Sequence, residues 1–311
     1  MTSPSATAAL TALLAATTLG LADPDTCAVV DAERPSVGVL SVSRGGSGPA
    51  CPDCVVQLQL IADAAFTTAF GPDTTDIIRD AIARADEIMS APQTAGGLDL
   101  HLVESDGYQY FGLNPWPEST NALTLLTTFA DWAETDFPVP RDRGDALILF
   151  TGLSLDGGAV GLSFQSSVCS DQAVGVVSYL TDNTEFNASI LVHMLGHILG
   201  ASHDGIGNTC DFTGHIMSPG VSEVNIPTTF SDCSIEEINA RIAAGADCLT
   251  LAPCNVADIA PPIGSLDFSD VVAFLAAFSA MEPHADLALP LGTFDFSDVS
   301  RFLSAYGAGC P

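Results

Sequence analysis

Three histidines, at positions 193, 197 and 203, have the spacing expected of ligands to one metal ion. His193 and His197 are four residues apart, so a helix would present both on one face. Gly200 allows a sharp turn that would bring His203 to the same ion. Three neutral imidazole nitrogens suit Zn²⁺ and leave one coordination position open. Hydrolytic zinc sites with this spacing have a glutamate after the first histidine as general base, whereas this chain has Met194, whose thioether cannot accept a proton.

The segments around the histidines alternate between strand and helix patterns. We expect the histidine helix to begin near Asn187, where polar residues precede an apolar run. Strands separated by helices predict an α/β domain with a mixed, mostly parallel sheet, in which one edge strand stays open for pairing. The expected strands are 55–63, 98–103, 145–150, 161–168 and 173–179, and the other expected helices are 73–89 and 119–135.

The run from His193 to Asp204 resembles the metzincin signature HExxHxxGxxHD, and its detail is similar to the adamalysin (reprolysin, M12B) branch. The likeness extends over about residues 53–250 and includes the segments 56–70, 161–169 and 230–234. It implies a metzincin-like fold, a Zn²⁺ ion, peptide-bond hydrolysis by zinc-activated water, and a polypeptide substrate or ligand.

The resemblance also implies roles for residues outside the histidine run. Met217 would form the methionine turn beneath the metal. His215 stands where the family usually has a cysteine and is not expected to be a ligand. An extended substrate would pair with the edge strand at Gly161, Leu162, Ser163 and Phe164, and disulfides would join Cys169 to Cys248 and Cys210 to Cys233.

Met194 leaves two functions open. In this family the glutamate takes a proton from the zinc-bound water and passes it to the leaving amine, and losing a positioned general base costs about 10²- to 10⁴-fold in rate. Asp204 and Glu185 are the nearest carboxylates in sequence, and neither is a convincing substitute. We therefore predict a strongly impaired zinc metalloendopeptidase. The alternative is a catalytically silent zinc protein that binds polypeptide without cleaving it.

The C-terminal segment, 254–311, contains two copies of one pattern, 28 residues apart. Two loop–helix units are the simplest interpretation, and a disulfide between Cys254 and Cys310 would staple so small a module. The pattern resembles the GC-type dockerin module, which implies a cohesin-like or cell-surface partner. EF-hand-like loops would bind Ca²⁺, although Ala260 and Ala288 stand where further oxygen ligands are needed. The candidate calcium ligands are Asp258, Asp267, Asp270, Asp286, Asp295 and Asp298.

Composition limits the partners of this chain. With 311 residues, of which 47% are hydrophobic, it can hold more than one domain. The net charge is −30, and none of its 8 basic residues, all arginine, lies between Arg143 and Arg241. Such a surface would repel nucleic acid and anionic membranes.

The N-terminal residues and the cysteines indicate export. Residues 1–22 read as a signal peptide, with an apolar stretch from Ala8 to Ala22, and 23–52 form an N-terminal segment before the zinc domain. No other stretch is long and apolar enough to span a membrane. Nine cysteines in an exported chain predict disulfides, and we read Cys51 and Cys54 as bridged, with an involvement of Cys27 left open. We expect a secreted protein, extracellular or associated with a cell surface.

Overall fold

A computed structural model describes most of the chain after residue 50. The described residues are 51, 54–110, 112–135, 145–178, 181, 183–251, 255–260, 263, 265–282, 285–288 and 293–310. The predicted signal peptide, Cys27 and Cys254 lie outside these residues. No helix among the described residues has both the length and the apolar character needed to cross a membrane.

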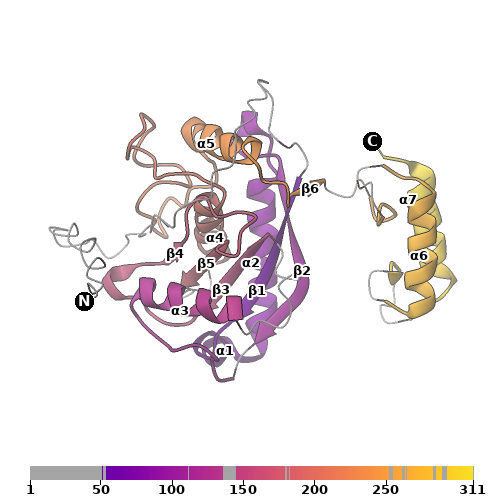
Figure 1. The fold of residues 1–311 in the computed structure, drawn as a ribbon, viewed down its shortest axis with the longest axis horizontal. Coiled ribbons are helices and arrows are strands. Elements are labelled where there is room, and N and C mark those ends of the chain that lie inside the picture. Colours follow the sequence, from indigo (N-terminus) through magenta and orange to yellow (C-terminus); the bar gives the residue numbers. More distant parts are fainter. Residues whose placement is uncertain are drawn as a thin grey trace, which may run out of the picture.

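The centre of residues 54–251 is a mostly parallel sheet, as the sequence pattern predicts (Figure 1). Its order is β2-β1-β3-β5-β4, and only β4 and the short β6 pair antiparallel to their neighbours. β4 therefore forms one edge of the sheet. The strands are β1 (Cys54–Ala62), β2 (Leu100–Tyr110), β3 (Ala146–Thr151), β4 (Gly161–Ser163), β5 (Val174–Ser178) and β6 (Thr250–Leu251).

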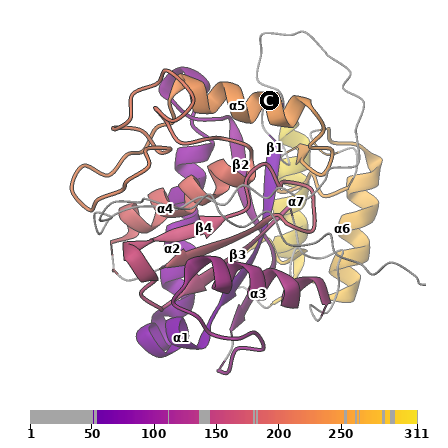
Figure 2. The same ribbon diagram turned by 60° about the vertical axis from the view of Figure 1, so that its left-hand side comes forward.

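Helices cover both faces of this sheet (Figure 2). Successive side chains of a strand point to opposite faces: Ile148 and Phe150 pack with α2, α4 and α5, whereas Leu147 and Leu149 pack with α3. Burial on both faces explains why β3 is apolar from Ala146 to Phe150. The helices are α1 (Ala64–Phe70), α2 (Thr74–Met89), α3 (Ala122–Thr135), α4 (Thr184–Ile198) and α5 (Asp232–Ala243).

The histidine helix starts earlier than expected. α4 begins at Thr184, because the Asn183 side chain accepts the N–H of Phe186 and caps the helix there. The prediction of a start near Asn187 was wrong by about one turn. Asn187 lies inside the helix, where its side chain donates to the carbonyl of Thr181.

The edge strand is shorter than the expected span of 161–168. β4 ends at Ser163, and Ser166 has a positive φ of 55° that breaks the extended backbone. The N–H groups of Ser166 and Val168 then donate to the carbonyls of His197 and Ile198. This segment caps the end of α4, where helix carbonyls lack partners of their own.

The C-terminal repeats form the two loop–helix units predicted from their periodicity. Their helices are α6 (Phe268–Ala280) and α7 (Phe296–Ala308), and each begins with a capping box made by two aspartates. Phe274 and Phe302, which are equivalent in the two repeats, stack with ring centroids 4.1 Å apart. This pair belongs to a small hydrophobic core that is separate from the two cores on either face of the sheet.

Candidate metal centre

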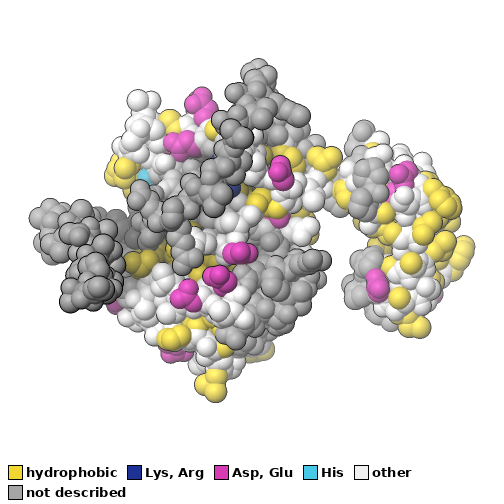
Figure 3. Space-filling model, in the orientation of Figure 1, with side chains coloured by type: hydrophobic (Ala, Val, Ile, Leu, Met, Phe, Trp, Pro, Cys, Tyr) yellow, Lys and Arg dark blue, Asp and Glu magenta, His cyan; other side chains and the backbone are white. Residues whose placement is uncertain are grey.

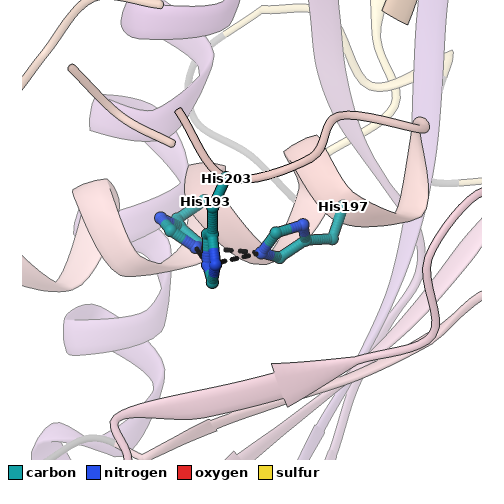
Figure 4. A group of neighbouring side chains, drawn as sticks. All are labelled: His193, His197 and His203. Atoms are coloured by element: carbon teal, nitrogen blue, oxygen red, sulfur yellow. Dashed lines mark hydrogen bonds between the residues drawn. The ribbon is translucent and has the colours of Figure 1, made fainter. Parts of the chain in front are cut away.

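Three imidazole rings converge at the end of α4 (Figure 4). His193 and His197 lie one turn apart on the helix, and His203 follows after Gly200, whose φ of +113° turns the chain. The Nε2 atom of His193 is 3.0 Å from that of His197 and 3.2 Å from that of His203, and the third pair is 3.3 Å apart. The spacing of the sequence motif therefore produces the predicted three-nitrogen cluster.

Backbone carbonyls fix the orientation of two of these rings. The Nδ1 atom of His193 lies 2.6 Å from the Ile216 carbonyl oxygen, and that of His197 lies 2.8 Å from the Ala201 carbonyl oxygen. Donation to these carbonyls places the proton on Nδ1 and leaves an Nε2 lone pair on each ring. Two such lone pairs cannot hydrogen-bond each other, so their close approach fits a shared cation. Zn²⁺ with Zn–N distances of about 2.0–2.1 Å fits nitrogens at this separation.

Burial keeps the rings neutral. Burial lowers the pKa of His193 to about 3, with a further contribution from nearby His203, and lowers the pKa of His203 to about 4. The pKa of His197 also falls well below its usual value, chiefly because burial disfavours the charged ring. Neutral imidazole is the form that binds a metal. The site is therefore prepared for a metal at neutral pH.

These pKa shifts predict that the metal-free chain loses stability as the pH falls below about 6.5. Unfolded histidines gain protons there, while His193, His197 and His203 stay neutral when folded. Each buried histidine thus lowers the free energy of unfolding by about 1.4 kcal/mol per pH unit. Asp63 and Asp145 act oppositely, because burial raises their pKa values, that of Asp145 to about 6, but three histidines outweigh two carboxylates.

Urea unfolding of the chelator-treated chain between about pH 7 and pH 5 measures this dependence. The control is Asp145→Asn, which removes an opposing proton and should make the loss of stability steeper. A free energy of unfolding that stays constant over this range in both proteins would contradict the prediction.

Met194 fills the space between the histidine helix and the edge strand. Its side chain is fully buried, and a Cβ atom placed on Gly161 would lie 2.9 Å from its Sδ atom. The Ser163 hydroxyl of the same strand donates to the Met194 carbonyl at 3.1 Å. An apolar thioether, packed against the edge strand, therefore stands at the residue where hydrolytic zinc sites of this spacing have a glutamate.

The two carboxylates nearest to Met194 in sequence have other partners, although only Oδ1 of Asp204 is hydrogen-bonded and its buried Oδ2 is not. Glu185 accepts two hydrogen bonds from the Arg84 guanidinium, at 2.6 and 2.8 Å, which lowers the pKa of Glu185. Asp204 is buried and accepts the hydroxyls of Ser231 and Ser234. Among the described residues, no carboxylate joins the histidine group. Within the part of the chain that the structure describes, no carboxylate therefore lies close enough to the three histidines to share an ion with them.

The other residues that the resemblance assigns to the site lie on the histidine helix's neighbours. Met217 is buried against the histidine helix, since a Cβ atom on Gly196 would lie 2.5 Å from the Met217 Sδ atom. Gly161, Leu162 and Ser163 pair with β5 and form the sheet edge, and Phe164 continues with one hydrogen bond to the Val174 carbonyl.

Three disulfides join described cysteines between residues 51 and 248. Cys169 bonds to Cys248 and Cys210 bonds to Cys233, which are the pairs implied by the resemblance. Cys51 bonds to Cys54. Cys310 is also disulfide-bonded, while its expected partner Cys254 lies outside the described residues. Disulfides persist in oxidising compartments, so this cysteine pattern fits an extracellular protein.

The six aspartates expected to bind calcium do not gather. Among the described residues, the three histidines form the only group of at least three potential ligands close enough to share an ion. Asp267 and Asp295 instead cap the N-termini of α6 and α7.

Sequence reasoning missed the groups that hold the histidines. The carbonyls of Ile216 and Ala201 orient two rings, yet every residue has a carbonyl and no sequence signal marks these two. It also missed Gln165 and Glu237, whose side chains bind the segment before His203. Their polar character is visible in the sequence, but their contacts depend on the folded chain.

The sheet and its helices have a metzincin-like fold, and the histidine cluster is a candidate metal site; comparison with known proteins agrees with this fold. Residues 114–253 match the sequence model of the Reprolysin (M12B) family zinc metalloprotease. A zinc metalloproteinase-disintegrin-like protein of Cerberus rynchops is 32% identical over 148 residues, which are 47% of this chain and 24% of that protein. The zinc metalloproteinase-disintegrin-like protein atragin of Naja atra is 30% identical over 176 residues, 56% of this chain and 28% of that protein.

These matches support an adamalysin-like zinc metalloprotease domain in this chain. The chain spans only about a quarter of the length of these relatives. Reprolysin-family proteases are zinc enzymes, which agrees with the three histidines in the structure.

Proposed function

We propose that this chain is a secreted, adamalysin-like zinc metalloendopeptidase-type protein in which peptide hydrolysis is strongly impaired. The observation that carries the proposal is the convergence of three Nε2 atoms in a site where a buried methionine follows the first histidine. His193, His197 and His203 would hold the metal, and Met194 removes the group that would move protons.

The remaining residues can still bind and orient a polypeptide. Bound zinc would supply Lewis acidity to a peptide carbonyl. β4 lies at the edge of the sheet, so its backbone can pair with an extended chain. Met194 cannot take a proton from water or return one to the leaving amine. Binding without efficient cleavage is the expected outcome.

The second candidate function is polypeptide binding with no turnover at all. The observation that favours it is the complete burial of the Met194 side chain between α4 and Gly161 of β4. An apolar side chain packed there stabilises the contact between helix and edge strand, whereas a catalytic carboxylate would have to remain accessible to a substrate.

The C-terminal module is proposed to anchor the protein to a cohesin-like or cell-surface partner. Hydrophobic side chains lie on the surface of α6 and α7 (Figure 3). Phe268 and Phe296, equivalent in the two repeats, are 74% and 77% exposed. Such exposed aromatic rings support a docking role for the module.

Metal analysis and a cleavage assay test the proposal on the purified native chain. We expect one Zn²⁺ per chain, binding of an unfolded polypeptide by the zinc-loaded form, and only trace cleavage that a chelator abolishes. Strong chelator-sensitive proteolysis would show that another group replaces the missing base. A chain that binds no zinc would refute both candidate functions.

A further inference from the structure

The residue before the third histidine is held from two sides. Ser202 lies between Ala201, whose carbonyl orients His197, and His203. Gln165, from the segment after β4, and Glu237, from α5, both form hydrogen bonds with Ser202. We propose that Gln165 and Glu237 are positioning residues that clamp Ser202 and thereby place His203 for metal binding. This inference rests on the proposed zinc site.

Gln165 connects the edge-strand segment to the histidine cluster. Its side-chain amide donates to the Ala201 carbonyl at 3.1 Å and to the Ser202 hydroxyl at 3.2 Å. The same Ala201 carbonyl accepts from Nδ1 of His197. Arg241 of α5 donates to the carbonyls of Ser166 and Val168 and so anchors the segment that carries Gln165.

Glu237 holds the other side of Ser202. Its carboxylate accepts the Ser202 N–H at 2.6 Å, which is a short, charge-assisted hydrogen bond. His203 lies outside the helix, so its backbone is not fixed by the helical hydrogen bonds that fix His193 and His197. Asn208 and the Asp204 N–H hold the chain on the far side of His203. Without the clamp, metal binding would have to order the side before His203, and the entropy of ordering would weaken the affinity.

The test compares zinc affinity in Gln165→Leu, Glu237→Ala and the double variant of the full-length chain, by chelator competition. Outer partners of metal ligands are commonly worth about 10- to 100-fold in affinity, so we expect each single variant to bind zinc about tenfold more weakly. Glu237→Gln keeps an acceptor oxygen and should restore most of the affinity. Glu236→Ala removes the adjacent, exposed carboxylate of α5 and serves as the matched control.

A second measurement separates this inference from the zinc site itself. In the metal-free chain, Glu237→Ala should accelerate hydrogen exchange of the Ser202 amide, while exchange in the interior of α4 stays unchanged. Unchanged exchange, or unchanged zinc affinity in the double variant, would overturn the clamp. Absence of zinc binding by the native chain would instead refute the proposed function, and the exchange result would still decide the clamp.

A separate observation concerns the carboxylates of the repeats. Asp270 Oδ1 accepts the N–H groups of Ile259 and Ala260, both at 2.8 Å, and its Oδ2 accepts the Asp267 N–H at 2.8 Å. Asp298 makes the same three contacts in the second repeat, with Leu287, Ala288 and Asp295. We infer that backbone amides take the place of a calcium ion in both loops, so the module folds without calcium.

The backbone N–H groups already neutralise much of the negative charge of Asp270 and Asp298, the role that a cation would otherwise have. Burial by itself would raise the pKa of Asp270, but the N–H groups of Asp267, Ala260 and Ile259 outweigh it and lower the pKa. Asp267 is also committed, because its Oδ1 accepts the Ser269 N–H at 2.6 Å. Calcium needs six to eight oxygen ligands with free lone pairs. Four of the six predicted calcium ligands, Asp267, Asp270, Asp295 and Asp298, are therefore already bound to backbone N–H groups and do not fit the ion.

Thermal unfolding of the full-length chain, followed in the module by NMR, tests this inference. The weakest extracellular calcium modules have dissociation constants of about 1 mM. We therefore expect the module to unfold at the same temperature in about 1 mM Ca²⁺ as in the presence of a chelator. Asp270→Asn should raise hydrogen exchange of the Ile259 and Ala260 amides about tenfold, since hydrogen bonds to charged groups are the strong ones. Glu282→Gln, at an exposed carboxylate of the same repeat, is the control. A calcium-dependent rise in unfolding temperature, or unchanged exchange in Asp270→Asn, would overturn it.

Discussion

Met194→Glu is expected to raise chelator-sensitive peptide cleavage by about 10²- to 10⁴-fold, the usual contribution of a positioned general base. Other features of the proposed site are present: three neutral nitrogens converge, Met217 packs against Gly196 of the histidine helix, and β4 offers a sheet edge. Only the proton acceptor is missing. Initial rates on an unfolded protein substrate, measured with zinc-analysed native and variant chains, provide the comparison.

The new carboxylate would enter a fully buried position. A buried carboxylate without a charge partner destabilises a protein, whereas a nearby divalent cation favours its ionised form. The variant should therefore depend on zinc for stability more than the native chain does, and it should be assayed with zinc bound.

Met194→Gln is the matched control for this experiment. Glutamine has the shape and polarity of glutamate but does not accept a proton at neutral pH, so cleavage should remain at the native level. Equal gains in Met194→Gln and Met194→Glu would show that polarity or repacking is responsible. No gain in a folded, zinc-loaded Met194→Glu variant would refute the view that the general base is the missing element.

The second large effect is expected for His197→Ala, which should weaken zinc binding by more than about 100-fold. Losing a hydrogen-bond partner of a metal ligand costs up to about 100-fold in affinity, and losing a ligand should cost more. His197 supplies one of the three converging nitrogens, and its ring is fully buried. Its loss leaves two histidines, which cannot complete a stable zinc site of the usual kind. Chelator competition and zinc content after dialysis measure the effect.

His101→Ala is the control, because this histidine lies on β2 with 40% of its side chain exposed and forms no part of the cluster. It should bind zinc like the native chain. If His197→Ala retained native affinity, the metal would have to lie elsewhere, and the assignment of the three histidines would be wrong.

Much of the site was visible in the sequence because its information is local. Histidines four residues apart share a helix face in any sequence context, and a glycine before the third histidine marks the turn. The prediction that the usual general base is missing follows from the identity of residue 194 alone. The alternation of strands and helices was likewise enough to predict the mostly parallel sheet.

Element boundaries were less predictable. α4 begins at an asparagine cap one turn before the expected start, and β4 ends where the chain turns to cap α4. Both boundaries depend on which polar groups find partners in the folded state. Those partners are far apart in the sequence or are backbone atoms.

The sequence by itself determined the chemistry of this protein: three neutral nitrogen ligands, a thioether in place of a carboxylate, and two equivalent loop–helix repeats. Only the tertiary structure decided which backbone groups complete that chemistry. The Ile216 and Ala201 carbonyls orient His193 and His197. Backbone N–H groups of the loops donate to the carboxylates of Asp270 and Asp298, which the sequence pattern predicted as calcium ligands. Side-chain chemistry is encoded residue by residue, whereas backbone groups are the same at nearly every position and differ only in where the fold places them.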